Sequence, residues 1–556
     1  MSTAMFDENM NLASIWEQIA DRQPDALALA HGDTTRTWAE FDERSSQLAA
    51  ALGAVGIGAG DNVACALLNG NEYIEAGYAA FKVRAAPCNV NYRYVEAELL
   101  YLIDNSDAKA VFFDASLAER FDNVHEQLTD VRLWIQVGGE GEPVPDWAVG
   151  FETLIADNEP AARIERSGQD LWLLYTGGTT GNPKGVMWPH HNILTITKRL
   201  FDGYGVTMPT SLDQVGQAAA SIAELGLAPR QMAASPLMHG TAGIGALMYL
   251  TCGGAVVTMT SRSLDADELW QTVQDRRCTV ASIVGDVFCT PMVESLDRAS
   301  EAGRPYDLTS LASITSSGVM WSQPVKDRLL AHAHAGGTTV ILNDSLGSSE
   351  GVGFAGKQSS AGGGADTETA TFTLGPDAAV FTEDGRRVEP GSDERGLLAV
   401  GGPIPLGYYG DPVKSAETFR EIEGQRWSIP GDWATVAADG TVTLLGRGSV
   451  SINTGGEKVY PEEIEEALKL LDQIVDANVV GVPDPKWGAA VTAIVQLTDG
   501  ATATDTELVD SLRASLSGYK LPKHIVRVDT LFRSPNGKSD YKWAVATAHK
   551  ALGIEQ

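Results

Sequence analysis

The sequence predicts an α/β protein with a large N-terminal domain of layered α/β sheets, a β-rich subdomain and a small C-terminal α+β domain. In the N-terminal part, strand-like apolar runs alternate with helical segments, which is typical of parallel α/β layers. Residues 370–445 are rich in short strand-like runs and turns, and the pattern changes again after residue 447. The 556 residues are enough for at least two domains, which we expect over 1–447 and 448–556.

The individual elements follow from these patterns in order. The N-terminal ones are a helix and then a strand within 12–30, a helix over 37–52, a strand over 63–68, a helix over 72–82, an extended segment over 86–90, and strands over 109–114 and 172–175. Further strands are expected over 255–258, 281–284 and 339–342. In the small domain we expect a helix over 461–468, strands over 475–482 and 491–497, and a helix over 505–517.

Composition and charge exclude several classes of protein. The chain is 44% hydrophobic and 21% charged, which is ordinary for a globular protein. It has no apolar run of about 18 residues, no visible signal peptide and no lipidation signal, so we expect a cytoplasmic protein without an integral membrane segment. A net charge of −32 argues against nucleic acid and anionic membranes as partners. The five scattered cysteines lack CxxC spacing, which predicts reduced core residues and no metal site.

A Gly- and Thr-rich segment follows the expected strand over 172–175. Its sequence, residues 176–185, is Thr-Gly-Gly-Thr-Thr-Gly-Asn-Pro-Lys-Gly. Glycines expose backbone N–H groups, threonines add hydroxyls and Lys184 adds a cation, which together suit a polyphosphate. It is not a Walker A loop, because Pro183 precedes the lysine and Gly185 follows it.

This order of residues resembles the phosphate loop of the adenylate-forming superfamily, which comprises acyl-CoA synthetases, luciferases and peptide-synthetase adenylation domains. The resemblance extends from about residue 12 to 545 and includes five motifs in the right order. It implies that the phosphates of ATP contact Thr176, Gly177, Gly178, Thr179, Thr180, Gly181 and Lys184.

The segment after the strand over 339–342 resembles the adenine and metal segment of the superfamily. The resemblance implies that Glu350 holds Mg²⁺ bridging the ATP phosphates, with Thr179 as a second metal-binding position. The nucleotide-binding residues that it implies here are Asp344, Ser345, Leu346, Gly347, Ser348 and Ser349. Two positions depart from the usual pattern: Leu346 stands where an aromatic residue usually stacks on adenine, and Ser349 stands where threonine is usual.

Two other motifs overlap this segment. Residues 347–351 match G-x-S-x-G, the nucleophile elbow of serine hydrolases, with Ser349 as the nucleophile. That elbow requires a strand directly before it and a helix directly after it, whereas residues 352–364 are too rich in glycine for a helix. Residues 351–356 match G-x-G-x-x-G but open no helix, so we interpret this match as coincidence.

The C-terminal motifs carry the remaining implied roles. Asp432 would accept hydrogen bonds from both ribose hydroxyls, supported by Arg447. Ser449 stands at the hinge position, where most relatives have Asp or Lys, and domain rotation there is expected. Lys538, in a Pro-Asn-Gly-Lys turn, matches the lysine that neutralises charge during adenylation. The residues implied in CoA binding and thioester formation are Gly455, Gly456, Glu457 and Lys458, and Gly456 would let the pantetheine arm pass close to the backbone.

Residues 236–240, Pro-Leu-Met-His-Gly, match a segment that lines the acyl pocket of the superfamily. His239 is as well interpreted as a packed wall residue as a catalytic one. By the same resemblance, the other residues bordering the pocket are Gly285, Val287, Ser316, Ser317, Gly318 and Met320.

The implied function is an ATP-dependent acyl-CoA ligase that uses Mg²⁺. A carboxylic acid and ATP give acyl-AMP and pyrophosphate, and CoA then displaces AMP. The sequences of these motifs are most similar to those of actinobacterial fatty-acyl-CoA ligases, including those acting on steroid side chains. Fatty, steroid side-chain and short thioether or branched acids all stay open as substrates. Homodimers are common among such enzymes and are one expected assembly. The alternatives are a peptide-synthetase adenylation domain, although no carrier domain is visible, a luciferase-type oxygenase, and a serine hydrolase at Ser349.

Overall fold

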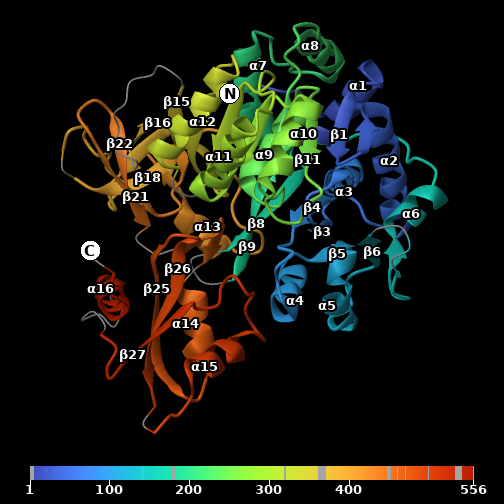
Figure 1. Cartoon of the computed structure of the whole chain (residues 1–556). Helices are drawn as coiled ribbons and strands as arrows, with labels where there is room; N and C mark the ends of the chain where they lie inside the picture. Colours follow the sequence, from blue (N-terminus) through green and yellow to red (C-terminus); the bar gives the residue numbers. More distant parts are fainter. Residues whose placement is uncertain are drawn as a thin grey trace.

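The computed structural model describes residues 5–138, 141, 143–177, 182–318, 321–360, 371–392, 394–447, 452–459, 461–469, 471–498, 500–532 and 541–554. It confirms the α/β class, with a large body of sheets and helices and a small C-terminal domain beside it (Figure 1). Within these residues the strands form three sheets, of 15, 7 and 5 strands. None of the described helices has the length and apolar character that crossing a membrane would require.

The 7-stranded sheet lies in the N-terminal part of the large body. Its strands are β3 (Asn62–Ala66), β4 (Ala86–Asn89), β5 (Ala108–Asp114), β6 (Leu133–Val137), β7 (Val149–Gly150), β8 (Leu171–Gly177) and β9 (Pro183–Pro189). They lie in the order β7-β6-β5-β3-β4-β8-β9, parallel except for the hairpin β8–β9. One face packs on α2 (Trp38–Ala54), α3 (Asn71–Lys82) and α6 (Phe151–Asp157). The other face packs on α4 (Glu96–Asn105) and α5 (Ala118–Asp122).

The 15-stranded sheet combines a parallel block with the β-rich segment. The parallel block and its edge contain β1 (Leu27–His31), β2 (Thr34–Thr37), β10 (Arg230–Ala233), β11 (Ala255–Thr258), β12 (Val280–Ile283), β13 (Ser313–Ser316) and β14 (Ile341–Ser348). The antiparallel block contains β15 (Gly351–Ser359), β16 (Thr371–Leu374), β17 (Ala378–Phe381), β18 (Gly396–Val400), β19 (Phe419–Ile422), β20 (Gln425–Ser428), β21 (Asp432–Val436) and β22 (Thr441–Arg447). The order is β19-β20-β18-β21-β22-β16-β15-β14-β13-β12-β10-β11-β1-β2, and β17 pairs with β18.

Helices cover the parallel block on both faces. On one face lie α10 (Ala266–Arg276), α11 (Gly285–Glu301) and α12 (Gln323–Ala335). Between the two large sheets lie α1 (Leu12–Arg22), α7 (His190–Tyr204), α8 (Leu212–Glu224) and α9 (Gly240–Thr251), which share one hydrophobic core with α3 and β8. The short α13 (Pro412–Thr418) precedes β19. The layers predicted from the alternation of strands and helices are therefore present.

The small domain is built on the 5-stranded sheet. Its strands are β23 (Ile452–Thr454), β24 (Glu457–Val459), β25 (Ile474–Asp484), β26 (Gly488–Leu497) and β27 (His524–Val528). Two hydrophobic clusters stabilise it: one joins the sheet to α14 (Pro461–Lys469) and α15 (Asp505–Leu512), and the other joins it to α16 (Tyr541–Leu552). Both clusters consist of residues from 452 onward. The predicted boundary at 448 falls between β22 and β23, and it stays a prediction because residues 448–451 lie outside the described residues.

Two predicted elements differ from the structure by five or more residues at one end. The strand expected over 339–342 begins at Ile341 and continues to Ser348, through the residues that were expected to follow the strand. It continues because β15 returns antiparallel to it, with Leu346 opposite Ala355, and the local Gly- and Ser-rich sequence gives no sign of this partner. The helix expected over 505–517 ends at Leu512. There Ser515 Oγ donates a hydrogen bond to the carbonyl of Leu512, and such local bonds compete with a helix.

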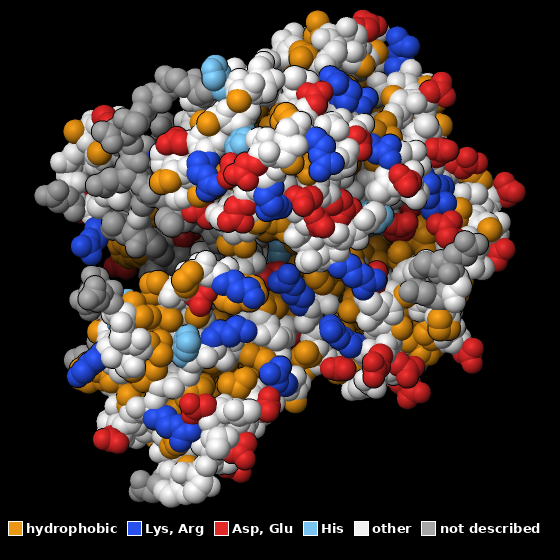
Figure 2. Space-filling model, in the orientation of Figure 1, with side chains coloured by type: hydrophobic (Ala, Val, Ile, Leu, Met, Phe, Trp, Pro, Cys, Tyr) orange, Lys and Arg blue, Asp and Glu red, His pale blue; other side chains and the backbone are white. Residues whose placement is uncertain are grey.

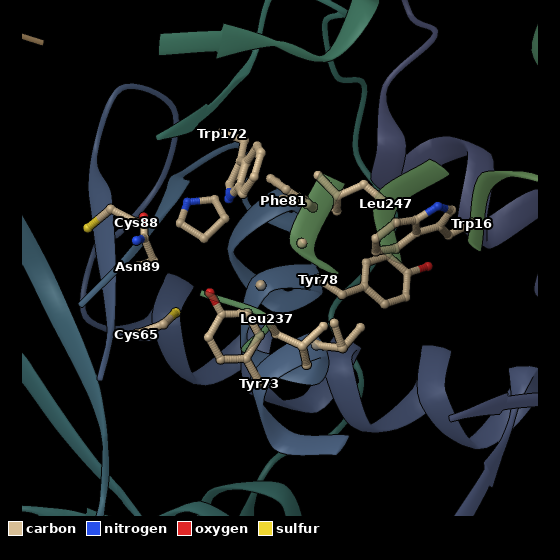
Figure 3. Close-up of a pocket in the computed structure, with 14 residues that line it drawn as sticks. Trp16, Cys65, Tyr73, Tyr78, Phe81, Cys88, Asn89, Trp172, Leu237 and Leu247 are labelled. Carbon is tan, nitrogen blue, oxygen red and sulfur yellow. The ribbon is translucent and has the colours of Figure 1, made fainter. Parts of the chain in front are cut away.

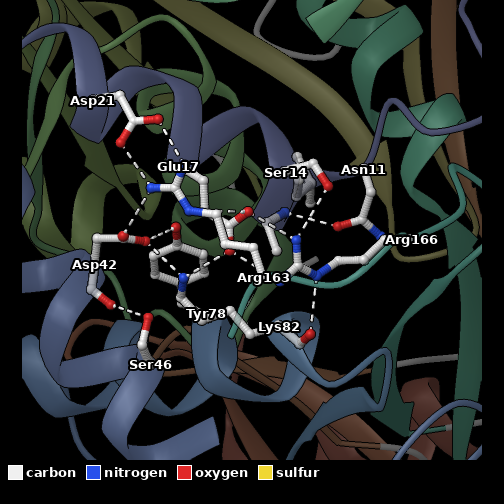
Figure 4. Close-up of polar contacts among 12 residues, drawn as sticks. Asn11, Ser14, Glu17, Asp21, Asp42, Ser46, Tyr78, Lys82, Arg163 and Arg166 are labelled. Atoms are coloured by element: carbon white, nitrogen blue, oxygen red, sulfur yellow. Dashed lines mark hydrogen bonds and ion pairs between the residues drawn. The ribbon is translucent and has the colours of Figure 1, made fainter. Parts of the chain in front are cut away.

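A buried polar network joins α1, α2 and α3 to the chain around Arg166 (Figure 4). Lys82 Nζ lies 3.0 Å from Glu17 Oε1 and 2.6 Å from Asp42 Oδ1. The guanidinium of Arg166 donates to both oxygens of Glu17 at 2.9 Å, and Tyr78 Oη donates to Asp42 at 2.5 Å. Because each buried charge has an opposite partner, the network fixes how these helices pack. The five cysteines are free and buried, as predicted.

Candidate active site

The site lies where parallel strands of the 15-stranded sheet end. Ile283 pairs with Ser316 at the ends of β12 and β13, and Ser316 pairs with Asp344 of β14. The backbone N–H of Gly285 donates to Ser316 Oγ at 2.8 Å. The chain segments that carry Gly285, Val287, Ser317 and Gly318 therefore meet at one edge of the sheet, as the predicted acyl pocket requires. Met320 lies outside the described residues.

The predicted phosphate loop connects β8 to β9. The strand expected to end at residue 175 extends to Gly177, because Thr176 pairs with Lys184 and Gly177 with Pro183 in the hairpin. Gly178, Thr179, Thr180 and Gly181 lie outside the described residues. Lys184 Nζ lies 2.9 Å from Asp411 Oδ2 and 5.6 Å from the centre of the Tyr408 ring. Burial alone would raise the pKa of the Asp411 carboxyl, but the hydrogen bonds from Lys184 and from the backbone of Lys414 lower it.

Glu350 lies buried in the turn between β14 and β15. Tyr408 Oη donates a hydrogen bond of 2.9 Å to its Oε1. Trp188 Nε1, on β9, donates to the carbonyl of the neighbouring Ser349 at 2.9 Å. Tyr408 and Trp188 thus connect the turn that carries Glu350 to the strand that carries Lys184. Tyr408 was not predicted as a site residue, although its position in a Gly-rich segment containing two adjacent tyrosines is a signal that could have singled it out.

The rest of the predicted adenine segment lies on β14. Ser345, Leu346, Gly347 and Ser348 are strand residues, and Leu346 is partly buried against the core between the sheets. The carboxylate of Asp344 is buried and pairs with Lys326 at 3.0 Å. Burial raises the pKa of Asp344, and Lys326 offsets part of this effect. Asp344 is therefore engaged in an internal ion pair, while its nucleotide-binding role stays a prediction.

The predicted ribose pair lies on neighbouring strands. Asp432 on β21 is directly opposite Arg447 on β22, which brings the two backbones together. The side chain of Arg447 lies outside the described residues, as do Ser449 and Lys538. The element that follows Lys538, α16, packs on the small domain's own sheet.

The loop between β23 and β24 of the small domain lies beside the edge of the 15-stranded sheet where β12 and β13 end. Gly455 and Gly456 adopt φ angles of 58° and 84°, in the left-handed region that favours glycine. A Cβ atom on Gly456 would lie 3.5 Å from Val284, the residue before Gly285. Gly456, the glycine predicted to let the pantetheine arm pass, thus lies beside the segment of the predicted acyl pocket that begins at Gly285. Lys458 is half-buried on β24.

Glu457 follows this glycine pair and makes two contacts with the large body. Its Oε2 lies 3.3 Å from His239 Nε2, and its Oε1 lies 3.0 Å from Arg93. Burial would raise the pKa of the Glu457 carboxyl, but His239 and Arg93 lower it below its usual value. His239 itself is the N-cap residue of α9 and is partly exposed. The loop predicted to act in thioester formation is therefore docked on the histidine of the predicted acyl pocket.

Further contacts across the same interface surround Lys520. Its Nζ pairs with Glu98 of α4 across the interface and with Glu463 of the small domain's own α14 at 2.7 Å, while Ser517 also donates to Glu98. Asn91 donates to Tyr519 Oη at 3.2 Å. These residues were not predicted to have a role, although the segment that contains Arg93 and Glu98 combines aromatic and charged side chains.

The local geometry around Ser349 does not form a nucleophile elbow. After Ser349 the chain enters β15, not a helix, and residues 351–356 lie on the same strand. A nucleophile elbow needs a helix at that point, so the serine-hydrolase interpretation lacks its structural basis.

The comparisons with known proteins agree with this arrangement. The family model for AMP-binding enzymes matches residues 16–409, and that for the AMP-binding enzyme C-terminal domain matches 463–538. The chain belongs to the AMP-binding enzyme family. It is 40% identical to the 3-oxocholest-4-en-26-oate–CoA ligase of Rhodococcus rhodochrous, covering 96% of this chain and 95% of that one. It is 39% identical to the medium/long-chain-fatty-acid–CoA/3-oxocholest-4-en-26-oate–CoA ligase of Mycobacterium marinum, covering 96% of each chain. These names indicate an AMP-forming acyl-CoA ligase.

Solved structures share the fold. The amide bond synthetase McbA of Marinactinospora thermotolerans superposes with a TM-score of 0.74 at 22% identity, over 97% of this chain and 99% of that one. A double mutant of the o-succinylbenzoate CoA synthetase of Bacillus subtilis, bound to a product analogue, superposes with a TM-score of 0.73 at 23% identity, over 96% and 98%.

Proposed function

We propose that this protein is an ATP-dependent acyl-CoA ligase that activates a fatty acid or a fatty-acid-like carboxylic acid, including steroid side-chain acids. Two contacts carry the proposal: Tyr408 lies beside Lys184 and donates to Glu350, and the Gly455–Glu457 loop docks on His239 through Glu457. The names of the relatives support the reaction, and the actinobacterial ligases among them support the acid class.

In the first half-reaction, a carboxylate oxygen of the acid attacks the α-phosphorus of ATP. The bond from that phosphorus to the bridging oxygen breaks, and pyrophosphate leaves. We assign phosphate binding to Thr176, Lys184 and the loop between them, and neutralisation of the developing charge to Lys538. When ATP binds, Lys184 would exchange its ion pair with Asp411 for one with phosphate, so the lysine would have an anionic partner in both states.

The residues around Glu350 fit a magnesium ion. The carboxylate is buried, Tyr408 fixes one of its oxygens, and the other accepts no hydrogen bond from the described residues. Mg²⁺ is usually held by one or two carboxylates together with substrate phosphates. Glu350, with Thr179 as the second proposed contact, would hold the ion, which supplies positive charge beside the phosphates.

In the second half-reaction, the thiol of CoA loses its proton, its sulfur attacks the acyl carbon, and the bond from that carbon to AMP breaks. The docked Gly455–Glu457 loop supports a small domain arranged for this step. We propose that the domain boundary near residue 448 and the hinge at Ser449 let this domain rotate, so that Lys538 serves the first step and the glycine loop serves the second.

A basic, aromatic surface beside the glycine loop suits the nucleotide end of CoA. Trp487 is 36% exposed, accepts a backbone hydrogen bond from Gly455 at 2.9 Å, and has Lys486 and Lys523 at 4.5 and 5.9 Å from its ring. Figure 2 shows Lys and Arg side chains gathered where the small domain meets the large body, on a protein whose net charge is −32. A ring flanked by cations can stack on a base and attract phosphates.

The test of the proposed function is pyrophosphate release with ATP, Mg²⁺ and CoA over a panel of acids, with mass detection of the thioester. Release together with an acyl-CoA supports the ligase, whereas release without a thioester points to another acceptor. Lys538→Ala should abolish acyl-AMP formation and spare thioester formation from supplied acyl-AMP. Equal loss of both half-reactions would contradict the domain rotation.

The proposal also covers the compartment and the oligomeric state of the protein. The buried free cysteines suit a reducing compartment such as the cytoplasm. A homodimer is the assembly to test first, by light scattering of the purified protein.

A further inference from the structure

One short segment of the large body, residues 91–98, contacts two separate parts of the small domain. Arg93 pairs with Glu457 of β24 at 3.0 Å, beside the glycine loop. Asn91 donates to the hydroxyl of Tyr519, which lies between α15 and β27, at 3.2 Å. Figure 1 shows α4, whose first turn belongs to this segment, on the side of the large body that faces the small domain. One contact alone would let the domain pivot, so the second part of the interface fixes its orientation.

This second part centres on the carboxylate of Glu98, in the first turn of α4. Lys520 Nζ pairs with its Oε1, and Ser517 Oγ donates to its Oε2. The backbone N–H of Lys520 donates to the carbonyl of Ser517 at 2.9 Å, so a single turn of the small domain presents both groups. All three residues are buried. Hydrogen bonds to an ionised group are stronger than neutral ones, and salt screens a buried ion pair less than an exposed one.

The large body holds this segment in a fixed position relative to the candidate active site. Asn89 ends β4 beside an internal cavity (Figure 3) and donates to the carbonyl of Tyr175, on β8, at 2.9 Å. Further along α4, Tyr101 donates to the carbonyl of Pro183, on β9, at 3.3 Å. The chain on both sides of Glu98 is therefore bonded to the hairpin that contains the predicted phosphate loop.

The ion pair between Lys520 and Glu98 can separate without leaving either charge alone. Lys520 also pairs with Glu463 of the small domain's own α14 at 2.7 Å. Glu98 also accepts a hydrogen bond of 3.1 Å from the backbone N–H of Val95, at the start of its own helix. Burial would lower the pKa of Lys520, but Glu463 and Glu98 raise it above its usual value, so the lysine stays charged. The network around Lys82 differs, because it joins only parts of the large body.

We propose that Lys520 and Glu98 are positioning residues for thioester formation: their ion pair, together with Ser517, selects the orientation of the small domain in which the glycine loop meets His239. We call this the docked orientation. Rotation at Ser449 would part the pair, because its members lie on opposite sides of the hinge. The pair therefore shifts the equilibrium towards the second half-reaction. This inference rests on the proposed function and on the domain rotation that it includes.

The first test measures the orientation itself, without substrates. Spin labels on cysteines introduced at Asp472 and Glu119 report the separation of the two domains, because both positions are exposed and the five native cysteines are buried. Glu98→Gln keeps a side chain that can complete the helix cap and loses the charge. It should lower the ratio of docked to undocked protein about tenfold, since hydrogen bonds to charged groups have this strength.

Glu463→Gln is the matched control. It removes a carboxylate from the same lysine, but that carboxylate belongs to the small domain, so the contact between the domains stays. The ratio of docked to undocked protein should therefore not change. Both variants leave Lys520 with one carboxylate, so an effect of weakened pairing alone would appear in both. Equal ratios in the two variants would overturn the proposal.

The second test separates the half-reactions, with the acid that releases most pyrophosphate in the panel described above. Glu98→Gln should slow thioester formation from supplied acyl-AMP about tenfold, and acyl-AMP formation from acid and ATP should be unchanged or faster. Glu463→Gln should leave both rates unchanged. A merely structural role of Glu98 would slow both half-reactions alike, and that result would also overturn the proposal.

The two tests distinguish this inference from the ligase function. If Glu98→Gln loses the docked orientation in a protein that forms no acyl-CoA with any acid, the proposed function is wrong, while Lys520 and Glu98 still select the orientation. If the protein is an active ligase and the two variants have the same orientation, only the inference about Lys520 and Glu98 is wrong.

Discussion

The carboxylate of Glu457, in the small domain, lies 3.3 Å from Nε2 of His239, in the large body. This contact places the loop of the small domain at the first turn of α9, beside the predicted acyl pocket. The same carboxylate also pairs with Arg93, so a single buried residue of the small domain connects two separate segments of the large one.

We expect Glu457→Gln to slow thioester formation from supplied acyl-AMP by about 10–100-fold, because hydrogen bonds to charged groups contribute about 1.5–3 kcal/mol. Acyl-AMP formation should change much less, since we propose that the loop serves the second step. The measurement is the rate of each half-reaction in rapid-quench experiments. Glu507→Gln, on α15 of the same domain, is the control. A larger effect on acyl-AMP formation than on thioester formation would contradict this assignment.

Tyr408→Phe should raise the magnesium concentration required for half-maximal activity by about tenfold or more, because groups that orient a metal ligand typically contribute 10–100-fold to affinity. The substitution removes the hydrogen bond to Glu350 and leaves the ring beside Lys184. A magnesium titration of pyrophosphate release measures the effect. Tyr409→Phe, which removes a hydrogen bond to Asp107 at 3.0 Å, should leave the titration unchanged. Identical titrations for the two variants would exclude Glu350 as a metal contact oriented by Tyr408.

Lys82→Met should lower the free energy of unfolding by about 3–5 kcal/mol, because it removes a buried cation that pairs with both Glu17 and Asp42 in this network. The lysine side chain is 3% exposed and contacts both Glu17 and Asp42. Urea denaturation gives the free energy. The comparison is Arg298→Met, which breaks a pair with Asp267 whose side chains are 58% and 60% exposed. That change should cost less than about 1 kcal/mol. Similar losses for both variants would show that the buried network does not hold the helices together.

His190 should make stability depend on pH below neutrality. Burial lowers its pKa from 6.5 to about 3, and its Nδ1 accepts a hydrogen bond from the backbone N–H of Leu12. Between these pH values the unfolded chain binds a proton at this residue and the folded chain does not. This contribution therefore lowers stability as pH falls from 6.5 towards 3, by about 1.4 kcal/mol per pH unit.

His190→Asn should remove this contribution while keeping an acceptor for Leu12. Thermal or urea unfolding between pH 4 and 7 should then show a smaller slope of stability against pH than in the unmodified protein. An unchanged slope would mean that His190 binds its proton equally well in both states.

Much of the fold could be predicted because local sequence patterns determine it. The alternation of apolar strands with helices between Leu12 and Asp114 is a local signal, and the structure has those elements within a few residues. The course of β14 beyond Leu342 could not be predicted, because its partner β15 determines it. Backbone pairing across a hairpin overrides the preference of Gly and Ser for loops.

The residues of the candidate site also form two groups: those that a local motif predicts, and those that only the folded chain brings together. Lys184, Glu350 and His239 occur in recognisable motifs, so they could be predicted as site residues from the sequence. Tyr408 acts on Glu350 from 58 residues away, and Arg93 contacts Glu457 across 364 residues. No motif contains both members of such pairs. The docking of the small domain on the large body could therefore not be predicted from the sequence.

The two hydrophobic clusters of the small domain draw on residues from 452 onward, while its described contacts with the large body include the ion pairs of Glu457 and Lys520 and a hydrogen bond to Tyr519. A unit with its own core can be inherited as a module. Recombination between related genes near the end of β22 would exchange the entire small domain without disturbing either interior. Only a few polar residues at the junction would have to match, so exchange of this segment is a short evolutionary route to new pairings of acid and acceptor.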